Sequence, residues 1–446
     1  MKSKTSKVLH PIAGLPLLGH VLKTVAQLSA ERTVVIVGPT QHDVAALAQS
    51  FDAEVAVQDP PLGTGHAVLQ AKPALASFSG LKDGGDILVV FGDTPLVRPE
   101  TLRRMTARRH EADKPAVVVF GFRPDDAALY GRLIQDADNH LTRIVEARDA
   151  NKDELAVGLC NGGVVVIDAE IAFELLAAIG NDNAKGEYYL TDIVSAAVEL
   201  GRRCAVVEGD AEEIMGVDNR AALAKAEALM QDRLRAAALA AGVTLTDPKT
   251  IYLSQDTVLG EDITIEPNVI IGAGVTIGDG VVIKGFSHIE GAVIAAGAVV
   301  GPFARLRPGA DLGENARVGN FVEVKNATIE AGAKVNHLSY IGDARVGAAA
   351  NVGAGTITCN YDGFNKSHTD IGAGAFIGSN TALVAPVAIG DGAIVGAGSV
   401  ISDDVAADAI AITRANQKQV VGGAERLRER KRAEKEARLK SQPAGN

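Results

Sequence analysis

The chain has 446 residues, enough for two or three domains with cores of their own. Its formal net charge is −11, and aromatic residues make up only 4% of it, without a single Trp. General nucleic-acid binding needs an exposed basic surface, and the binding of single strands needs aromatic side chains on which bases stack. The composition therefore argues against a nucleic-acid-binding protein.

The cysteines and the apolar segments indicate where the protein works. Cys160, Cys204 and Cys359 lie far apart and form no CxxC motif, so we expect neither a disulfide framework nor a cysteine zinc site. No run approaches 18 apolar residues, and the first residues lack the apolar stretch of a secretory signal. We therefore expect a cytoplasmic protein with no membrane partner.

Residues 1–240 alternate between strand-like and helix-like segments. The helical segments fall near 17–28, 41–50, 66–77 and 99–110, and the strands are expected at Thr33–Val37, Glu54–Val57, Ile87–Gly92, Ala116–Gly121 and Gly163–Ile167. Several of these strands are near-continuous apolar runs, which is typical of strands covered on both faces. The alternation predicts an α/β domain with a mostly parallel sheet, whose ligands bind beyond the carboxyl ends of the strands.

A period of six residues dominates the second half of the chain. It appears at Ile265, Ile271, Ile277, Ile283 and Ile289, and again at Ile371, Ile377, Leu383, Ile389, Val395 and Ile401. This period is typical of a hexapeptide β-helix, in which three repeats complete a coil and the periodic residue fills the interior. The repeats run from about 250 to 410, and a polar insertion at 353–370 interrupts them. An insertion on a solenoid is where function usually lies.

These patterns divide the chain into four parts. We expect an α/β domain at 1–217, a linker with a long helix from Asn219 to about Ala241 at 218–245, and the repeats at 246–420. The tail at 421–446 mixes basic and acidic residues over 425–440, with pairs such as Arg430 and Glu434 at i,i+4. This spacing predicts a solvated helix.

Three motifs in the first half point to phosphate and metal chemistry. Asp93 ends a buried strand, where a carboxylate is well placed for Mg²⁺, although a turn or helix-capping Asp is an equal alternative. Asp218, at the start of the long helix, is a second candidate ligand with the same alternative. The segment Leu62–His66 contains a GxG turn before a helix, and helix N-termini favour anions.

In the second half, His337 is a candidate general base. It occupies a repeat position where a small or apolar residue would pack well, and a lone His there is more often structural. Arg305, Arg307 and Lys325 lie within two coils of it, and Arg307 and Lys325 are one 18-residue coil apart. Stacked cations repel each other unless they bind an anion, and a sugar phosphate would satisfy both.

Together these motifs resemble one family closely, the bacterial bifunctional enzymes with N-acetylglucosamine-1-phosphate uridyltransferase and glucosamine-1-phosphate N-acetyltransferase activities. The resemblance covers almost the whole chain. It rests on these segments: Lys7-Val-Leu-His10, Leu62-Gly-Thr-Gly-His-Ala67, Phe91-Gly-Asp93, Tyr130-Gly-Arg132, Asn183-Ala-Lys-Gly-Glu-Tyr-Tyr-Leu-Thr-Asp192, Gly301-Pro-Phe-Ala-Arg-Leu-Arg-Pro-Gly309, Val318-Gly-Asn-Phe-Val-Glu-Val-Lys325 and Asn351-Val-Gly-Ala-Gly-Thr-Ile-Thr-Cys-Asn-Tyr-Asp-Gly363.

For the first half, the resemblance implies a Rossmann-like nucleotidyltransferase that transfers a uridylyl group from UTP to N-acetylglucosamine 1-phosphate. Asp93 and Asp218 match the Mg²⁺ positions, and the added charge of Asp218, where the family usually has Asn, predicts a different metal affinity. Lys7 looks like the phosphate-binding lysine. The remaining matches are uridine-binding and sugar-binding positions, namely Gln58, Gly63 and Thr64, and Gly131, Glu146 and Asn161.

For the second half, the resemblance implies a left-handed β-helix that forms homotrimers and transfers acetyl from acetyl-CoA to glucosamine 1-phosphate. His337 matches the general base, and Asn360 and Tyr361 match active-site positions on the insertion. The other matches are sugar-phosphate contacts at Arg307, Lys325, Tyr340 and Asn351, and acetyl-CoA positions at Ala354, Ser379, Ala397 and Arg414.

The beginning of the chain departs from the family pattern. Met1 stands where the family's phosphate loop, Leu-x-x-Gly-x-Gly-Thr-Arg-Met, ends. We expect a misassigned start and a longer natural protein, and the alternative is an acetyltransferase with a decayed uridyltransferase domain. Two other hypotheses remain open at this stage, a sugar nucleotidyltransferase with a purely structural β-helix and a trimeric scaffold without activity.

Overall fold

The computed structural model describes residues 1–127, 130–183 and 185–440. The chain forms two compact units, Met1–Gly291 and Ala292–Asn446. The predicted domain boundaries after 217, 245 and 420 stay predictions, and residues 441–446 of the predicted tail lie outside the described residues.

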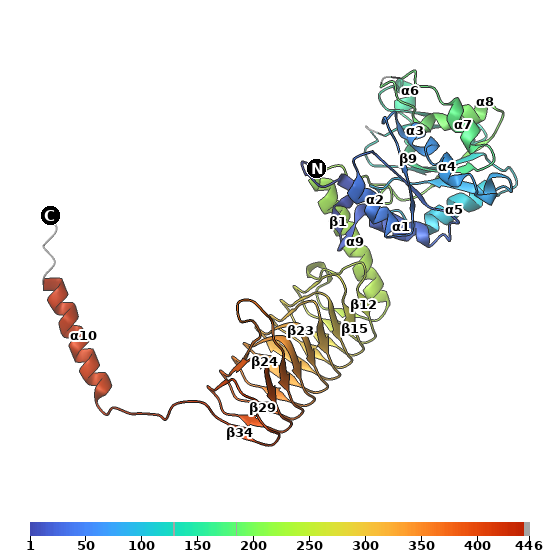
Figure 1. Cartoon of the computed structure of the whole chain (residues 1–446). Coiled ribbons are helices and arrows are strands. Elements are labelled where there is room, and N and C mark those ends of the chain that lie inside the picture. The colour runs from blue at the N-terminus through green and yellow to red at the C-terminus, as the bar shows by residue number, and fades with distance from the viewer. Residues whose placement is uncertain (128–129, 184, 441–446) are drawn as a thin grey trace. The chain divides into compact units, whose positions relative to one another are not determined.

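The first unit begins with an α/β fold (Figure 1). Its helices are α1 (Leu17–Ala26), α2 (His42–Gln49), α3 (Thr64–Leu69), α4 (Lys72–Leu75), α5 (Pro99–Arg109), α6 (Lys152–Leu155), α7 (Ala172–Ala178), α8 (Ile193–Glu199) and α9 (Arg220–Ala240). Its strands are β1 (Pro11–Ile12), β2 (Leu15–Pro16), β3 (Val34–Val37), β4 (Glu54–Val57), β5 (Asp86–Val89), β6 (Val117–Phe122), β7 (Arg132–Gln135), β8 (Leu141–Val145), β9 (Cys160–Asp168) and β10 (Cys204–Glu208). All five predicted strands are present, whereas β1, β2, β7, β8 and β10 were not predicted.

The main sheet of this fold is mixed. β10 and β6 pair in parallel, but β9 pairs antiparallel with β5, β6 and β7, and β7 pairs antiparallel with β8. Strands β5, β6, β7 and β10 therefore run in one direction and β8 and β9 in the other. Most strands of the sheet run in the same direction, as expected. Most neighbouring pairs are nevertheless antiparallel, because β9 runs the other way and lies between β5 and β6.

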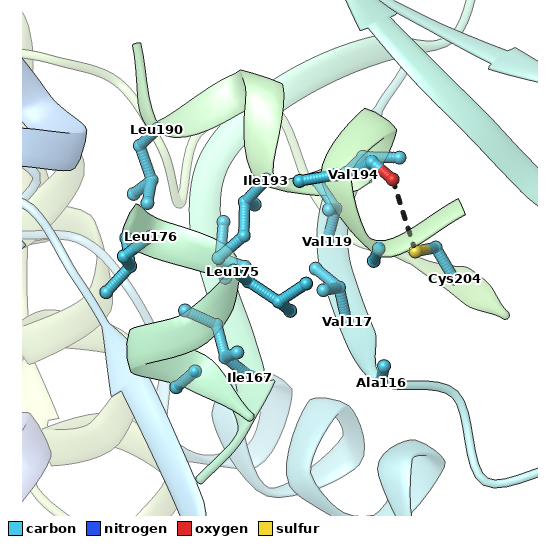
Figure 2. Close-up of a cluster of buried hydrophobic side chains, with 14 of the residues drawn as sticks. Ala116, Val117, Val119, Ile167, Leu175, Leu176, Leu190, Ile193, Val194 and Cys204 are labelled. Atoms are coloured by element: carbon cyan, nitrogen blue, oxygen red, sulfur yellow. Dashed lines mark hydrogen bonds between the residues drawn. The ribbon is translucent and has the colours of Figure 1, made fainter. Parts of the chain in front are cut away.

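Apolar side chains of this sheet and of helices α7 and α8 form a core. Figure 2 shows Val117, Val119 and Ile167 from β6 and β9 packed with Leu175 and Ile193 from the two helices, and all five are fully buried. At the edge of the core, the Cys204 thiol donates to the Val194 carbonyl oxygen at 3.9 Å, and burial raises the pKa of this thiol to about 12. This core fixes the strands whose ends carry the candidate residues.

The first unit ends with short parallel strands of the predicted repeats. They are β11 (Thr244–Leu245), β12 (Val258–Leu259), β13 (Thr264–Ile265), β14 (Ile270–Ile271), β15 (Thr276–Ile277), β16 (Val282–Ile283) and β17 (His288–Ile289). Pairs such as Thr264 with Val282 are one coil of 18 residues apart. The periodic isoleucines from Ile265 to Ile289 are buried, which confirms that the six-residue period marks the interior.

The second unit also forms a parallel β-helix (Figure 1). Its strands are β18 (Ala292–Ile294), β19 (Val299–Val300), β20 (Arg305–Leu306), β21 (Ala310–Leu312), β22 (Arg317–Asn320), β23 (Glu323–Ile329), β24 (Lys334–His337), β25 (Tyr340–Val346), β26 (Asn351–Val352), β27 (Ile357–Cys359), β28 (Thr369–Ile371), β29 (Phe376–Ile377), β30 (Ala382–Val384), β31 (Val387–Ile389), β32 (Ile394–Val395), β33 (Val400–Ile401) and β34 (Ile410–Ala411).

The coils of this unit differ in length. Arg305 pairs with Glu323 after 18 residues, but Tyr340 pairs with Ile357 after 17, and Ala344 pairs with Thr369 after 25. The longest coil contains the predicted insertion, whose loop joins β27 to β28. The tail forms helix α10 (Gly423–Lys440), which buries no residue and carries ion pairs of Glu434 with Arg430 and Lys431. In the part of the chain that the structure describes, no helix is long and apolar enough to cross a membrane.

Candidate functional site

In the first unit, three residues far apart in sequence meet at one point. The Lys7 ammonium lies 2.6 Å from Asp93 Oδ2 and 2.7 Å from Asp218 Oδ1. The Val217 amide donates to the Asp93 carbonyl oxygen at 3.0 Å, which ties the segment after β5 to the start of α9. The two predicted metal ligands and the predicted phosphate-binding lysine therefore form one cluster, as the resemblance implies.

Neither carboxylate caps a helix. The N-cap of α9 is Asn219, whose side chain accepts from the Ala222 amide at 2.9 Å. Helix α5 begins only at Pro99, with Arg98 at its N-cap position. The helix-capping alternative that we weighed for Asp93 and Asp218 is therefore wrong, whereas Asp93 does lie in a turn, which was its other alternative.

The cluster has the donor set of a site for a hard cation. Two carboxylate oxygens converge on one positive charge, and carboxylates are the ligands that Mg²⁺ prefers. Partial burial disfavours the charged form of Lys7, but hydrogen bonds and charges from Asp218 and Asp93 outweigh it and raise the lysine pKa above its ordinary value. The residues present thus fit a divalent ion.

The predicted uridine-binding residues shape the loop before α3. Gly63 precedes the helix with a φ of +112°, and a Cβ there would lie 2.6 Å from the Tyr188 carbonyl oxygen, so only glycine suits this position. The Gln58 amide donates to the Gly63 carbonyl oxygen at 2.9 Å, and Thr64 Oγ1 accepts from the Leu190 amide at 3.0 Å. The loop is thereby held against the segment around Tyr188 and Leu190.

The predicted sugar-binding residues come together where β7 and β9 begin and β8 ends. The Asn161 amide donates to the Gly131 carbonyl oxygen at 2.8 Å, and a Cβ built on Gly131 would lie 3.6 Å from Glu146 Oε1. Burial, and then the charge of Asp149, raise the pKa of the Glu146 carboxyl. Burial likewise raises the pKa of Asp192, which faces the same acidic group. The sequence analysis named neither Asp149 nor Asp192 as a site residue, although Asp192 ends one of the segments that carry the resemblance.

In the second unit, His337 begins a column of residues on successive coils. Asn320 pairs directly with His337, and the strand registers that align Val335 with Val352, Ile377 and Val395 place Ala354, Ser379 and Ala397 in line with the histidine. Backbone bonds follow the column, from the Gly355 amide to His337 O and from the Gly398 amide to Ser379 O. Arg414 donates to the Ala397 carbonyl oxygen. One column therefore holds the predicted base and three of the four predicted acetyl-CoA positions, and the fourth, Arg414, contacts the last of them.

His337 itself is exposed, which corrects the expectation that it occupies a packed repeat position. The interior position of its coil belongs to Val335, which is fully buried, and His337 lies two residues further along the strand, on the outside. Its Nδ1 lies 2.6 Å from Asn320 Oδ1. Because the Asn320 oxygen can only accept a hydrogen bond, Nδ1 is the donor, and in the neutral ring the opposite nitrogen, Nε2, is left as the acceptor. The sequence analysis missed Asn320 because it assumed coils of 18 residues, whereas the coil from Asn320 to His337 has 17.

A group of cations lies on the neighbouring face. Arg307 and Lys325 follow the paired residues Leu306 and Val324, so the predicted stacking is present. Arg307 also forms an ion pair of 2.8 Å with Glu323. The nearby Lys366 ammonium, and to a lesser degree Arg307, lower the pKa of Lys325. Crowded cations of this kind favour an anionic ligand. Lys366 comes from the insertion loop and was not predicted.

The insertion loop is fixed by its own polar side chains. Asn360 donates to Asp343, which also accepts from Asn326 at 2.7 Å, and the Tyr361 hydroxyl donates to the Gly363 carbonyl oxygen at 2.6 Å.

Of the remaining predicted contacts, Tyr340 pairs with Glu323 and Ile357, and the Asn351 amide donates to the Ala375 carbonyl oxygen at 2.8 Å. Tyr340 also lines a hollow with Arg305.

The chain matches two family models. Residues 1–186 match a MobA-like NTP transferase domain, and residues 256–291 and 368–403 match six repeats of the bacterial transferase hexapeptide. The "Bifunctional protein GlmU" of Paramagnetospirillum magneticum is 57% identical over 435 residues, which cover 98% of this chain and 95% of the relative. The chain belongs to the GlmU family.

Further GlmU relatives agree. That of Rhodospirillum rubrum is 58% identical over 96% of this chain and 94% of its own length, and that of Zymomonas mobilis is 50% identical over 97% and 95%. Membership of the GlmU family confirms the predicted fold class, an α/β nucleotidyltransferase followed by a left-handed parallel β-helix. It also confirms a bifunctional transferase for uridylyl and acetyl transfer, a family that generally uses a divalent metal and acts on small molecules.

Proposed function

We propose that the two activities reside at the two sites described above and act in sequence. The β-helix site acetylates glucosamine 1-phosphate with acetyl-CoA, and the Lys7–Asp93–Asp218 cluster then supports uridylyl transfer from UTP to the N-acetylglucosamine 1-phosphate formed. The observation that carries this assignment is the column that joins His337 to Ala354, Ser379 and Ala397. A purely structural β-helix has no need of it.

For acetyl transfer, His337 is the general base. The amine of glucosamine 1-phosphate attacks the thioester carbonyl carbon, the carbon–sulfur bond breaks, and coenzyme A leaves as the thiolate, which becomes the thiol by taking a proton from the imidazolium of His337. Nε2 of His337 accepts the amine proton, and Asn320 holds the ring tautomer that makes this possible. We assign the sugar phosphate to Arg307, Lys325, Tyr340, Asn351, Asn360 and Tyr361, and acetyl-CoA to Ala354, Ser379, Ala397 and Arg414.

For uridylyl transfer, a phosphate oxygen of N-acetylglucosamine 1-phosphate attacks the α-phosphorus of UTP, and pyrophosphate leaves. We propose that Asp93 and Asp218 hold Mg²⁺, which when bound neutralises phosphate charge, and that Lys7 binds phosphate. Gln58, Gly63 and Thr64 bind uridine, and Gly131, Glu146 and Asn161 bind the sugar. Positioning and charge neutralisation are the main demands of this reaction.

We also propose a cytoplasmic homotrimer. Acetyl-CoA and UTP are cytoplasmic metabolites, and the three cysteines carry free thiols, which suits a reducing compartment. Sedimentation equilibrium tests the trimer, for which we expect three times the mass of one chain.

Two assays on the full chain test the assignment of the activities. Acetyl-CoA consumption with glucosamine 1-phosphate reports the first site, and pyrophosphate release from UTP with N-acetylglucosamine 1-phosphate and Mg²⁺ reports the second. We expect both. Pyrophosphate release that Asp93→Ala leaves unchanged would contradict the proposed role of the Lys7 cluster, and pyrophosphate release without acetyl transfer would contradict that of the His337 column.

A further inference from the structure

We infer that Lys7 competes with a divalent metal ion for the carboxylates of Asp93 and Asp218, and that phosphate binding to Lys7 relieves this competition. The inference rests on the proposed function of the cluster and adds a role to its lysine. Lys7 would then be the residue that couples metal binding to nucleotide binding.

The competition follows from the geometry of the ammonium. It lies 2.6 Å and 2.7 Å from the two carboxylate oxygens, which is the distance of a charge-assisted hydrogen bond. A metal ion bound to the same oxygens would lie within about 5 Å of that ammonium, because metal–oxygen distances are about 2.1 Å for Mg²⁺. Like charges at this separation repel strongly in a partly buried site, so the two cations exclude each other.

The cluster is built so that the lysine can leave while the carboxylates stay. The bond from the Val217 amide to the Asp93 carbonyl oxygen holds the two acidic segments together without help from Lys7. The Lys7 side chain is 37% exposed and the Asp218 side chain 74%, so the ammonium can swing outward without disturbing the core. Lysine is suited to this exchange because its charge lies at the end of a flexible stem.

Phosphate binding explains why Lys7 would leave the two carboxylates. A nucleotide triphosphate offers several anionic oxygens, and an ammonium binds them as a point charge. When Lys7 turns to phosphate, Asp93 and Asp218 lose their counter-ion and become more attractive to a divalent ion. Metal and nucleotide therefore strengthen each other's binding by the same factor, as linkage requires.

Binding of Mn²⁺ to the full chain, measured by the electron paramagnetic resonance signal of free Mn²⁺, tests this inference without any assay of activity. In the absence of nucleotide, we expect Lys7→Met to tighten Mn²⁺ binding about tenfold, because it removes a competing unit charge while keeping the length of the side chain. Lys7→Arg keeps the charge and should retain the weak binding. UTP should tighten Mn²⁺ binding more in the wild type than in Lys7→Met.

Matched variants distinguish a wrong competition mechanism from a wrong metal site. Lys4→Met removes an exposed charge of the same segment and should change nothing, whereas Asp93→Asn should weaken Mn²⁺ binding in every background. Binding that depends on Asp93 but is unchanged or weaker in Lys7→Met would overturn the competition. If Asp93→Asn has no effect, the proposed metal site itself is wrong. Should Lys7→Met unfold, Lys7→Gln gives the same comparison, with thermal unfolding in the presence and absence of Mn²⁺ as a second measurement.

Discussion

At the residue scale, substitution of His337 tests whether the β-helix carries the acetyltransferase site. We expect His337→Ala to lower the rate of acetyl transfer by about 10²–10⁴-fold, the usual contribution of a general base, and to leave uridylyl transfer unchanged. Acetyl-CoA consumption and pyrophosphate release measure the two effects. His288→Ala removes an exposed histidine from another strand, β17, and is the matched control. Equal loss of both activities in His337→Ala would contradict the assignment.

Asp93 provides the complementary test in the first unit. We expect Asp93→Ala to reduce metal-dependent UTP turnover at least about a hundredfold, because it removes a carboxylate of the proposed metal site, and to spare acetyl transfer. Steady-state pyrophosphate release measures the loss. Asp262→Asn is the control, since it removes an exposed carboxylate at a φ of +54°, a conformation that Asn tolerates. A fall in acetyl transfer would show that the two sites are not independent.

The cations around Lys325 predict a pH dependence. In the proposed site, Lys325 would bind phosphate only in its protonated form, and the Lys366 ammonium lowers the lysine pKa below the ordinary value of 10.5. As the pH rises, Lys325 therefore loses its charge earlier than an ordinary lysine. We expect the dissociation constant for N-acetylglucosamine 1-phosphate to increase with pH in a window below 10.5.

Lys366→Met should move this window to higher pH, even if it weakens binding at neutral pH. Isothermal titration calorimetry with the sugar phosphate, which has no amine of its own, measures the shift. Lys334→Met, at an exposed position of β24, is the control and should leave the window in place. An unchanged window in Lys366→Met would mean that Lys366 does not act on Lys325.

At the scale of single elements, the loop before α3 depends on one glycine. Gly63→Ala places a side chain at a φ of +112° and within 2.6 Å of a backbone oxygen, so we expect a loss of about 1–3 kcal/mol in the free energy of unfolding and weaker UTP binding. Gly84→Ala has a positive φ but no neighbouring atom within 4 Å, and it should cost less, about 1 kcal/mol. Denaturant unfolding compares the two, and equal losses would mean that the close approach to Tyr188 is unimportant.

Individual elements also show which features of the fold could be predicted from the sequence. The six-residue period predicted the buried isoleucines correctly, because interior packing imposes it on every coil. The direction of β9 could not be predicted, since an apolar run such as Val164–Ile167 looks the same in a parallel and an antiparallel strand. The 17-residue coils were missed because one residue fewer changes a turn and leaves the interior pattern intact. Asn320 was therefore not recognised as the partner of His337.

At the scale of the whole molecule, the chain joins two transferase sites that share an intermediate. The clusters themselves could not be derived from residue patterns alone, because Lys7, Asp93 and Asp218 meet only through the tertiary fold. The resemblance to the family identified the residues of each cluster, and in the structure these residues lie close together. Since the product of acetyl transfer is the acceptor of uridylyl transfer, the account predicts that it can pass through solution from one site to the other.

A mixing experiment shows whether the two sites are separate and linked by a diffusing intermediate. His337→Ala and Asp93→Ala are assayed alone and together for UDP-N-acetylglucosamine formed from glucosamine 1-phosphate, acetyl-CoA, UTP and Mg²⁺. The account predicts little product from either variant alone and restored synthesis in the mixture, because each variant supplies the reaction that the other lacks. No restoration, although each variant keeps its own half-reaction, would contradict two separate sites linked by a diffusing intermediate.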